Sequence, residues 1–210
     1  MDSRFRGNDE RRLQSGRGKR RPYGVANLMD VMEAIRARHS VRIYTPDPVS
    51  EETLAALLDA ARLAPSWANV QPCELIVVRD PATKEKLAGT LSPKNPGARA
   101  VREAPVVIAA AFREKASGYY KGLQATTLGD YGPFDLGLAM AHLSLAAVSM
   151  GLATLHVGLL DLGKAEEILG IPEGVRLLEL MPVGVADGPA VSPPRKDLSA
   201  FVHRERYGQR

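Results

Sequence analysis

The longest uncharged stretch of the chain, Leu136 to Leu160, constrains the fold more than any other feature. Its 25 residues include no Asp, Glu, Lys or Arg. A membrane-spanning helix needs about 20 consecutive apolar residues, but Gly151 interrupts this stretch. Polar side chains also occur within it: His142, Ser144, Ser149, Thr154 and His156. We therefore predict a fully buried helix over about 134–150 and a buried strand over about 153–158, since an all-round apolar helix belongs in a large core or a subunit interface.

Composition favours one globular domain in a reducing compartment. Of the 210 residues, 45% are hydrophobic and 25% are charged, which is enough apolar material to fill a core. Cys73 is the single cysteine, which excludes an internal disulfide and a cysteine-based metal cluster. The four histidines lack metal-ligand spacing, and we expect His142 and His156 to be satisfied core or interface groups. We predict no metal site and a cytoplasmic location.

The basic charge of the chain is concentrated at its N-terminus. Residues 1–28 hold eight Arg or Lys and three acids, whereas the remainder has 20 bases and 21 acids. This arm lacks the apolar core of a signal peptide and has too few apolar residues to offset the entropy of ordering. We predict a disordered extension over 1–28 and a single domain over 29–210. Binding of nucleic acid or membrane by the arm is an alternative function, which we do not favour because charge runs are usually just solvated.

Helical and strand patterns follow one another along the domain. Ser50 is an N-cap candidate for a helix that ends near Pro65, and Asp161 is one for a short helix that Gly170 stops. Further helices are predicted over 29–38 and from Asp80 to Leu87. Strands are predicted over 75–78, 106–111 and 177–185, and the first is a continuous apolar run that suggests burial on both faces. We expect a surface loop over 92–100, a helical excursion over a site at 116–134, and a C-terminal segment, 195–210, too charged to join the core.

Two arginines bracket a hydroxyl at Arg38, Ser40 and Arg42. The guanidinium group is a planar fork that suits phosphate oxygens, and alternate residues of an extended segment point to the same side. Such a trio would hold one phosphate, with each charge-assisted hydrogen bond contributing about 1.5–3 kcal/mol. The motif alone leaves a solvated basic turn open as the alternative.

The loop from Pro65 to Pro72 combines polar groups with an aromatic ring. Ser66, Asn69 and Gln71 can donate and accept hydrogen bonds, and Trp67 adds a flat apolar face. This combination suits a planar heterocycle that carries carbonyls and ring nitrogens. A capped turn is the alternative when the loop is considered by itself.

None of the remaining motifs supports a P-loop, a dinucleotide-binding site or a catalytic cysteine. The segment from Gly158 to Ala165 resembles a P-loop but lacks the hydroxyl that would hold Mg²⁺, so we interpret it as a strand-to-helix turn. No G-x-G-x-x-G pattern follows a strand. A catalytic Cys–His pair at Cys73 has no second supporting motif.

The chain resembles the nitroreductase family of FMN-dependent oxidoreductases over about residues 29–210. The Arg-x-Ser-x-Arg motif at 38–42 comes first, followed by the Ala-Pro-Ser-x-x-Asn-x-Gln-Pro loop at 64–72. Asp135 and Gly137 then match an Asp-x-Gly helix, and 151–158 match Gly-Leu-x-Thr-x-x-x-Gly. Pro182-Val-Gly184 and Arg195-Lys196 fit the end of the family pattern. The chain departs from it at Cys73, where Trp is common, and at His142, where Asn is common, which leaves the shape of the substrate pocket open.

The resemblance implies an α+β fold with a small central sheet flanked by helices, dimerised over the long central helices. It also implies two FMN sites at the dimer interface, each lined by both chains. By analogy, the phosphate and ribityl chain are held by Arg38, Ser40, Arg42 and Arg195, with His39 as a neighbour at best. The ring is met by the loop residues Pro65, Ser66, Trp67, Asn69 and Gln71. Val157 and Gly158 are expected to line its other side through their backbone.

The same resemblance implies a homodimeric NAD(P)H-dependent reductase of nitroaromatics, quinones or similar small-molecule electrophiles. Hydride transfer would be ping-pong, and no catalytic side chain is expected because the flavin carries the chemistry. Reductive dehalogenation, enone reduction and flavin fragmentation are alternatives within the same fold. The sequence does not distinguish NADH from NADPH or name the acceptor.

Overall fold

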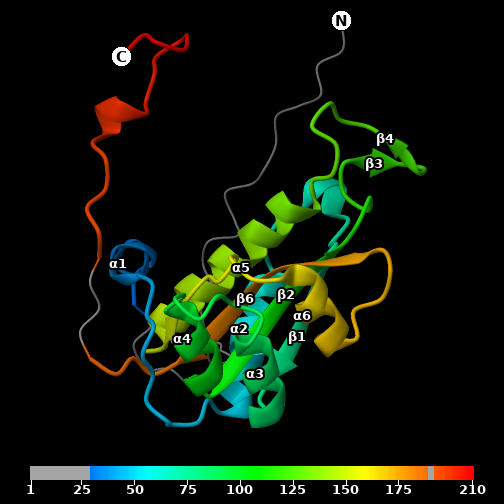
Figure 1. The fold of residues 1–210 in the computed structure, drawn as a ribbon. Coiled ribbons are helices and arrows are strands. Elements are labelled where there is room, and N and C mark those ends of the chain that lie inside the picture. The colour runs from blue at the N-terminus through cyan, green and yellow to red at the C-terminus, as the bar shows by residue number, and fades with distance from the viewer. Residues whose placement is uncertain (1–28, 189–191) are drawn as a thin grey trace, which may run out of the picture.

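A central antiparallel sheet with the strand order β1-β2-β6-β5 organises the molecule (Figure 1). The computed structural model describes residues 29–188 and 192–210, so the arm predicted to be disordered, 1–28, lies outside the described residues. The four strands are β1 (Cys73–Val78), β2 (Val106–Arg113), β6 (Val175–Gly184) and β5 (Ala153–Thr154). The two longest strands, β2 and β6, lie at the centre, where β2 is buried along nearly its whole length.

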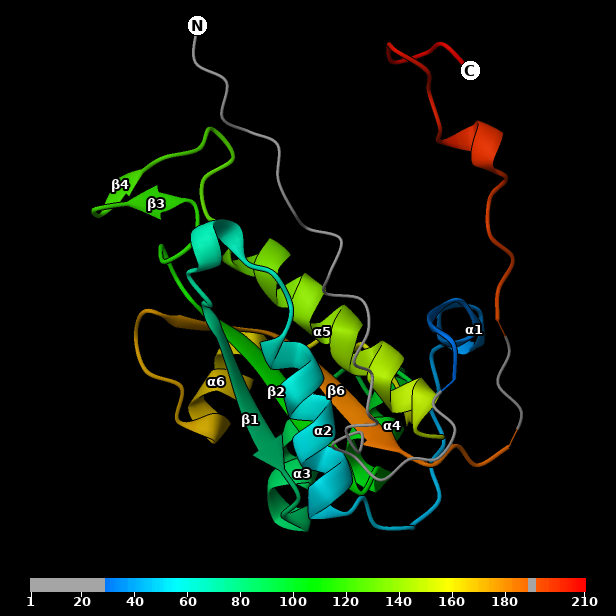
Figure 2. The same cartoon turned by 180° about the vertical axis from the view of Figure 1, so that it is seen from behind.

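Helices cover both faces of the sheet and divide the core in two (Figures 1 and 2). On one face pack α2 (Glu51–Arg62) and α5 (Gly132–Ser149), with Leu57, Ile108 and Leu143 fully buried between helices and sheet. On the other face lie α3 (Pro81–Ala88), α4 (Gly97–Glu103) and α6 (Leu162–Leu169). The short α1 (Val31–Ala37) lies against α5. The predicted α+β fold, a small sheet flanked by helices, is confirmed.

Local capping explains where several helices begin. The Ser50 hydroxyl accepts a hydrogen bond from the Thr53 amide at 3.1 Å, and Asp161 accepts one from the Lys164 amide at 3.1 Å. Each satisfies an amide that the first helical turn leaves without a partner. Helix α6 ends at Gly170 in the left-handed conformation (φ 66°), as its sequence predicted. The segment from Gly158 to Ala165 is therefore a capped turn.

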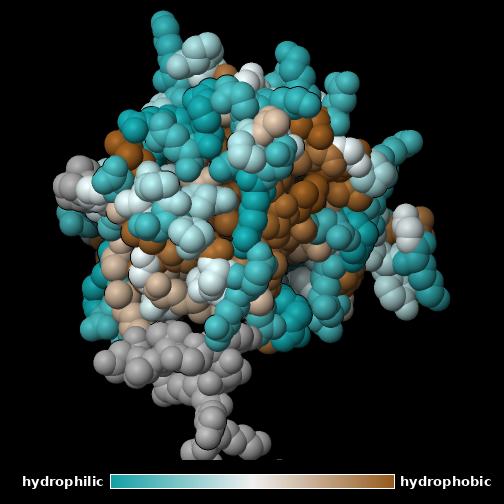
Figure 3. All heavy atoms as spheres, turned by 90° about the horizontal axis from the view of Figure 1, so that it is seen from below, coloured by the Kyte–Doolittle hydropathy of each residue, from teal (hydrophilic) through white to brown (hydrophobic). Residues whose placement is uncertain are grey.

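Helix α5 is only half buried in one protomer, so the prediction of a fully buried helix is wrong for the single chain. Leu136, Met140 and Leu143 face the core. The opposite side exposes Phe134 (61% exposed), along with four smaller or more polar residues: Pro133, Gly137, Ala141 and His142. No helix among the described residues is long and apolar enough to cross a bilayer. The view from below shows an exposed apolar area, in brown, bordered by polar side chains (Figure 3).

Three local predictions are wrong, and each failed because tertiary neighbours decided the outcome. Strand β1 lies at the sheet edge, so most of its side chains are half buried rather than covered on both faces. Residues 97–103 of the predicted loop form α4, whose Ala100 and Val101 are fully buried. The excursion over 116–134 contains a hairpin, β3 (Tyr119–Tyr120) and β4 (Leu123–Gln124). Its two-residue turn, Lys121 (φ 51°) and Gly122 (φ 78°), has the positive φ values that tight hairpins favour.

Gly184 gives a stability prediction for the sheet. A Cβ atom at this position would lie 2.6 Å from Cδ of Pro105 and 3.1 Å from Cδ1 of Tyr44, neither of which can move easily. We expect Gly184→Ala to lower the free energy of unfolding by about 1–3 kcal/mol through overpacking, measured by urea denaturation. Gly163→Ala is the control, because its added Cβ meets only one atom, at 3.8 Å, and the helix gains up to about 1 kcal/mol. Equal midpoints for the two variants would contradict the prediction.

Candidate flavin site

The loop after α2 has a strained backbone at the predicted ring-binding residues. Ala68 (φ 47°), Asn69 (φ 56°) and Gln71 (φ 51°) all adopt the left-handed conformation, although none is glycine. Residues held in such conformations cost about 1–3 kcal/mol each and cluster at ligand-binding sites. The loop includes a short 3-10 turn, Trp67–Asn69, and Asn69 and Gln71 are exposed.

Hydrogen bonds from inside and outside the loop fix this conformation. The Ser66 hydroxyl accepts from the Gln71 amide at 2.9 Å, which closes the loop on itself. The Asp135 carboxylate at the start of α5 accepts from the Trp67 amide at 3.1 and 3.2 Å. From β2, the Arg113 guanidinium donates to the Gln71 carbonyl at 2.7 Å. The strain is therefore balanced by contacts from two core elements.

A cavity of about 380 Å³ opens between this loop, α2, β1 and α5. Its volume lies in the range of small-molecule sites. Three of the predicted ring-binding residues line it, namely Pro65, Ser66 and Gln71, together with Cys73 and Asp135. Sequence reasoning matched Asp135 to the family pattern but assigned it no role. Its sequence signals are that match and its place directly before a long uncharged stretch.

The Cys73 thiol in this cavity is protected from ionisation. Burial, assisted by the negative charge of Asp135, raises the pKa of Cys73 from 9.0 to about 11. Because the thiolate is the nucleophile, we expect iodoacetamide to alkylate the folded protein about 100-fold more slowly at pH 8 than the urea-unfolded protein. The folded state keeps the proton that the unfolded state loses, so its stability falls as pH rises from 9 toward 11. Mass spectrometry measures the reaction at the single cysteine, and equal rates would contradict the prediction.

The predicted phosphate-binding segment runs beside β5. Ser40 forms a parallel bridge with Thr154, and the Val41 amide donates to the Thr154 carbonyl at 3.1 Å. The buried Tyr44 hydroxyl anchors the end of the segment by donating to the Val41 carbonyl at 2.8 Å. The segment is thereby held extended, the geometry in which alternate side chains share a side.

The two arginines of this segment are available to a ligand. Arg38 and His39 are half buried, and Arg42 is exposed. Within residues 29–188 and 192–210, neither Arg38 nor Arg42 forms an ion pair with an acidic side chain. Arg42 makes one long hydrogen bond, 3.4 Å, to the Ser40 carbonyl.

Val157 and Gly158, the residues predicted to line the other side of the ring, differ in exposure and in backbone hydrogen bonding. The Val157 side chain is buried in the core, and both its amide and its carbonyl bond to Leu180 at 3.0 Å. Gly158 is exposed, and nothing lies within 4 Å of a Cβ added there. The residue before them, His156, is exposed and pairs with Glu179 at 2.9 Å rather than lying in the core of the protomer.

Arg195 lies on the C-terminal segment, which runs past α1 and away from the sheet (Figures 1 and 2). In the described parts of the chain, the hydrogen bonds of residues 192–210 stay within that segment. Among the described residues, no hydrogen bond or ion pair links Arg195 to Arg38 or Arg42.

The phosphate-binding segment and the strained loop lie at opposite ends of α5. Trp67 bonds to Asp135 in the first turn of this helix, whereas Ser40 pairs with Thr154, which follows the last turn. The helix rise separates the two ends by about 20 Å. In one protomer, the two predicted halves of the flavin site therefore lie about one helix length apart.

An orphaned hydroxyl supports a ligand at the first half-site. Thr154 is fully buried beside Ser40, and its Oγ1 is the only buried side-chain polar atom in the described residues without a hydrogen-bond partner. Such groups are rare in folded proteins and call for an explanation. Arg38 and Arg42 belong to the segment that pairs with Thr154 and form no ion pair within the described residues, so this segment fits a phosphorylated ligand, and the strained loop fits a planar ring.

The chain is similar to known proteins over most of its length. The nitroreductase family pattern matches residues 35–185. The NAD(P)H FMN reductase of Bacillus subtilis is 27% identical over 194 residues, which cover 86% of this chain and 75% of the relative. The 5,6-dimethylbenzimidazole synthase of Rhodospirillum rubrum is 32% identical over 169 residues, or 72% of this chain and 80% of that protein.

A solved structure shows the same architecture. The NADPH:FMN oxidoreductase of Vibrio harveyi, in complex with NAD⁺, superimposes with a TM-score of 0.73 at 25% identity, covering 85% of this chain and 78% of that one. The chain therefore belongs to the nitroreductase family, and it is an NAD(P)H-dependent flavin oxidoreductase of that family.

Proposed function

We propose that the chain is a cytoplasmic, homodimeric FMN enzyme that reduces nitroaromatics, quinones or similar electrophiles with NADH or NADPH. The observation that carries this proposal is the combination of two arginines that form no ion pair within the described residues, on a segment paired with Thr154, and a strained polar loop. Bound FMN would supply hydride transfer between a nicotinamide and an acceptor. The protein's own residues bind and orient it.

The proposal gives each group of residues a task. Arg38, Ser40 and Arg42 hold the phosphate and ribityl chain, with His39 as a neighbour and Arg195 as a further phosphate contact. Pro65, Ser66, Trp67, Asn69 and Gln71 form the surface that meets the ring. Gly158 admits the ring closely because it has no side chain, and Val157 supports it from the core. No side chain is assigned as acid or base.

A homodimer follows from the separation of the half-sites. A two-fold axis crossing the middle of α5 places the first turn of one helix near the last turn of its partner. The strained loop of one protomer then meets the phosphate-binding segment of the other. The small, exposed residues Gly137 and Ala141, in the middle of α5, permit close helix packing at this axis.

The test is the absorption spectrum of the purified protein with and without added FMN, followed by acid release of the flavin and titration with NADH. We expect a yellow protein whose flavin is bleached by NADH and restored by a nitroaromatic or quinone. A colourless protein that takes up no FMN overturns the proposal.

A second candidate function uses the same fold. The similarity to the Rhodospirillum rubrum 5,6-dimethylbenzimidazole synthase favours an enzyme that consumes its flavin as substrate. Product analysis after incubation with reduced FMN and oxygen distinguishes the two. Loss of FMN with formation of a benzimidazole supports the second candidate, whereas intact FMN and a reduced acceptor support the first.

A further inference from the structure

Asp135 is the most deeply buried charged residue in the described chain, with 1% of its surface exposed. Its carboxylate accepts hydrogen bonds from two segments that are distant in sequence. One donor is the Trp67 amide of the strained loop, at 3.1 and 3.2 Å. The other is the hydroxyl of Ser117, which is itself fully buried. A single side chain thus joins the loop to the excursion between β2 and α5.

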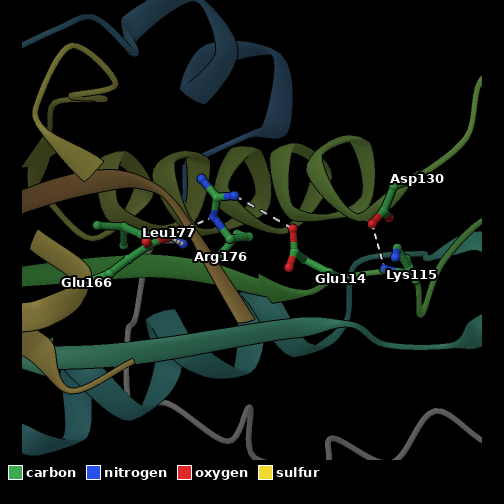
Figure 4. Close-up of polar contacts among 6 residues, drawn as sticks. All are labelled: Glu114, Lys115, Asp130, Glu166, Arg176 and Leu177. Carbon is green, nitrogen blue, oxygen red and sulfur yellow. Dashed lines mark hydrogen bonds and ion pairs between the residues drawn. The ribbon is translucent and has the colours of Figure 1, made fainter. Parts of the chain in front are cut away.

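Hydrogen bonds hold together the two ends of that excursion, residues 115–131, at its base. The Asp130 carboxylate accepts from the Lys115 amide at 2.6 Å and from the Gly132 amide at 2.8 Å. Figure 4 shows the contact between Asp130 and Lys115. It also shows Arg176 of β6, whose guanidinium nitrogens lie 3.8 Å from a carboxylate oxygen of Glu114 and 3.1 Å from one of Glu166. The Tyr131 amide also donates to the Ser117 carbonyl at 3.1 Å. Ser117 therefore sits at a closed, well-anchored base.

The tip of the excursion is exposed and apolar. Tyr120 is 66% exposed, Leu123 74% and Leu128 79%. A molecule that packs against this tip would contact a hairpin that is connected, through Ser117 at its base, to the Asp135 carboxylate. The only described side chain that bonds both the excursion and the strained loop is that carboxylate.

We propose that Asp135 is a positioning residue that couples the excursion to the loop Ser66–Gln71 and holds the loop in its binding conformation. The Trp67 amide precedes the first left-handed residue, Ala68, so its hydrogen bond fixes where the strained stretch begins. The Ser117 hydroxyl fixes the rotation of the carboxylate. The role of the loop in binding FMN rests on the proposed function, but the coupling itself does not.

The single tryptophan of the sequence makes the loop directly observable, because all tryptophan emission comes from Trp67. We expect Asp135→Ala and Ser117→Ala to lower the fluorescence anisotropy of Trp67 and shift its emission to longer wavelength in the apoprotein. Asp135→Asn retains an acceptor for the Trp67 amide and should restore most of the wild-type signal. The control is Ser144→Ala on the same helix, which removes an equally buried hydroxyl that bonds only to the Ala141 carbonyl.

FMN affinity provides the second measurement. We expect the dissociation constant to rise about 10- to 100-fold in Asp135→Ala, less in Ser117→Ala, and not at all in Ser144→Ala. The double variant should lose no more than Asp135→Ala alone, because both changes act through one carboxylate. If Asp135→Ala does not fold, as judged by circular dichroism, Ser117→Ala decides the matter.

Two failures are distinguishable. Wild-type emission, anisotropy and FMN affinity in Ser117→Ala, and in Asp135→Ala if that variant folds, overturn the coupling. A wild-type protein that binds no FMN overturns the proposed function instead, while the Trp67 signals of the apoprotein still test the coupling.

Discussion

Replacing Arg38 and Arg42 together by Ala should weaken FMN binding about 100-fold. Charge-assisted hydrogen bonds contribute about 1.5–3 kcal/mol each, and the lower value applies because Arg42 is exposed and its charge is screened. Each substitution then costs about a factor of ten in the dissociation constant. The double variant loses hydrogen bonds to the phosphate of FMN. Riboflavin has no phosphate, so it should bind the wild type and the double variant with equal affinity.

Fluorescence titration with FMN and riboflavin measures both effects. Arg36→Ala is the matched control, because Arg36 is an exposed arginine in the last turn of α1 but lies outside the Arg-x-Ser-x-Arg motif. An equally large loss of FMN affinity in Arg36→Ala, or of riboflavin affinity in the double variant, would show that the net positive charge rather than a phosphate site is responsible.

Placing a carboxylate in the middle of α5 should abolish both the dimer and FMN binding. Ala141 is exposed in one protomer and lies near the proposed two-fold axis, so Ala141→Asp would bury two like charges opposite each other. An unpaired buried charge costs about 3–5 kcal/mol, which weakens the dimer by a factor of about 100 to 1,000 or more. FMN binding should fall in parallel, because each site needs a half from either chain.

Light scattering after gel filtration reports the oligomeric state, and flavin fluorescence reports binding. Ala82→Asp, the same substitution on the exposed surface of α3, is the control and should remain a flavin-binding dimer. A monomeric Ala141→Asp variant that binds FMN with wild-type affinity would refute the two-chain site.

Much of the local structure was readable from the sequence because its causes are short-range. Ser50 and Asp161 cap their helices through amides three residues away, and such hydrogen bonds leave a fixed spacing in the sequence. The motif at Arg38 to Arg42 and the loop at Ser66 to Gln71 were likewise found from residue type and spacing alone. The family to which the chain belongs followed from their order.

The sequence misled where long-range neighbours decide the conformation. The run at 75–78 is apolar throughout, yet β1 lies at a sheet edge, and nothing in its own residues says which strands flank it. The glycine- and proline-rich stretch around Gly97 forms a helix because Ala100 and Val101 bury themselves in the core.

The sequence by itself determined the helix caps and the residues of the motifs, because these depend on side chains close together along the chain, and the resemblance that the motifs carry implied the fold class. Only the tertiary structure decided that Asp135 and Arg113 hold the strained loop and that the loop lies at the other end of α5 from Arg38 and Arg42. Distances between segments 42 or more residues apart depend on how the helices and the sheet pack. That packing is a property of the whole core, which no single motif contains.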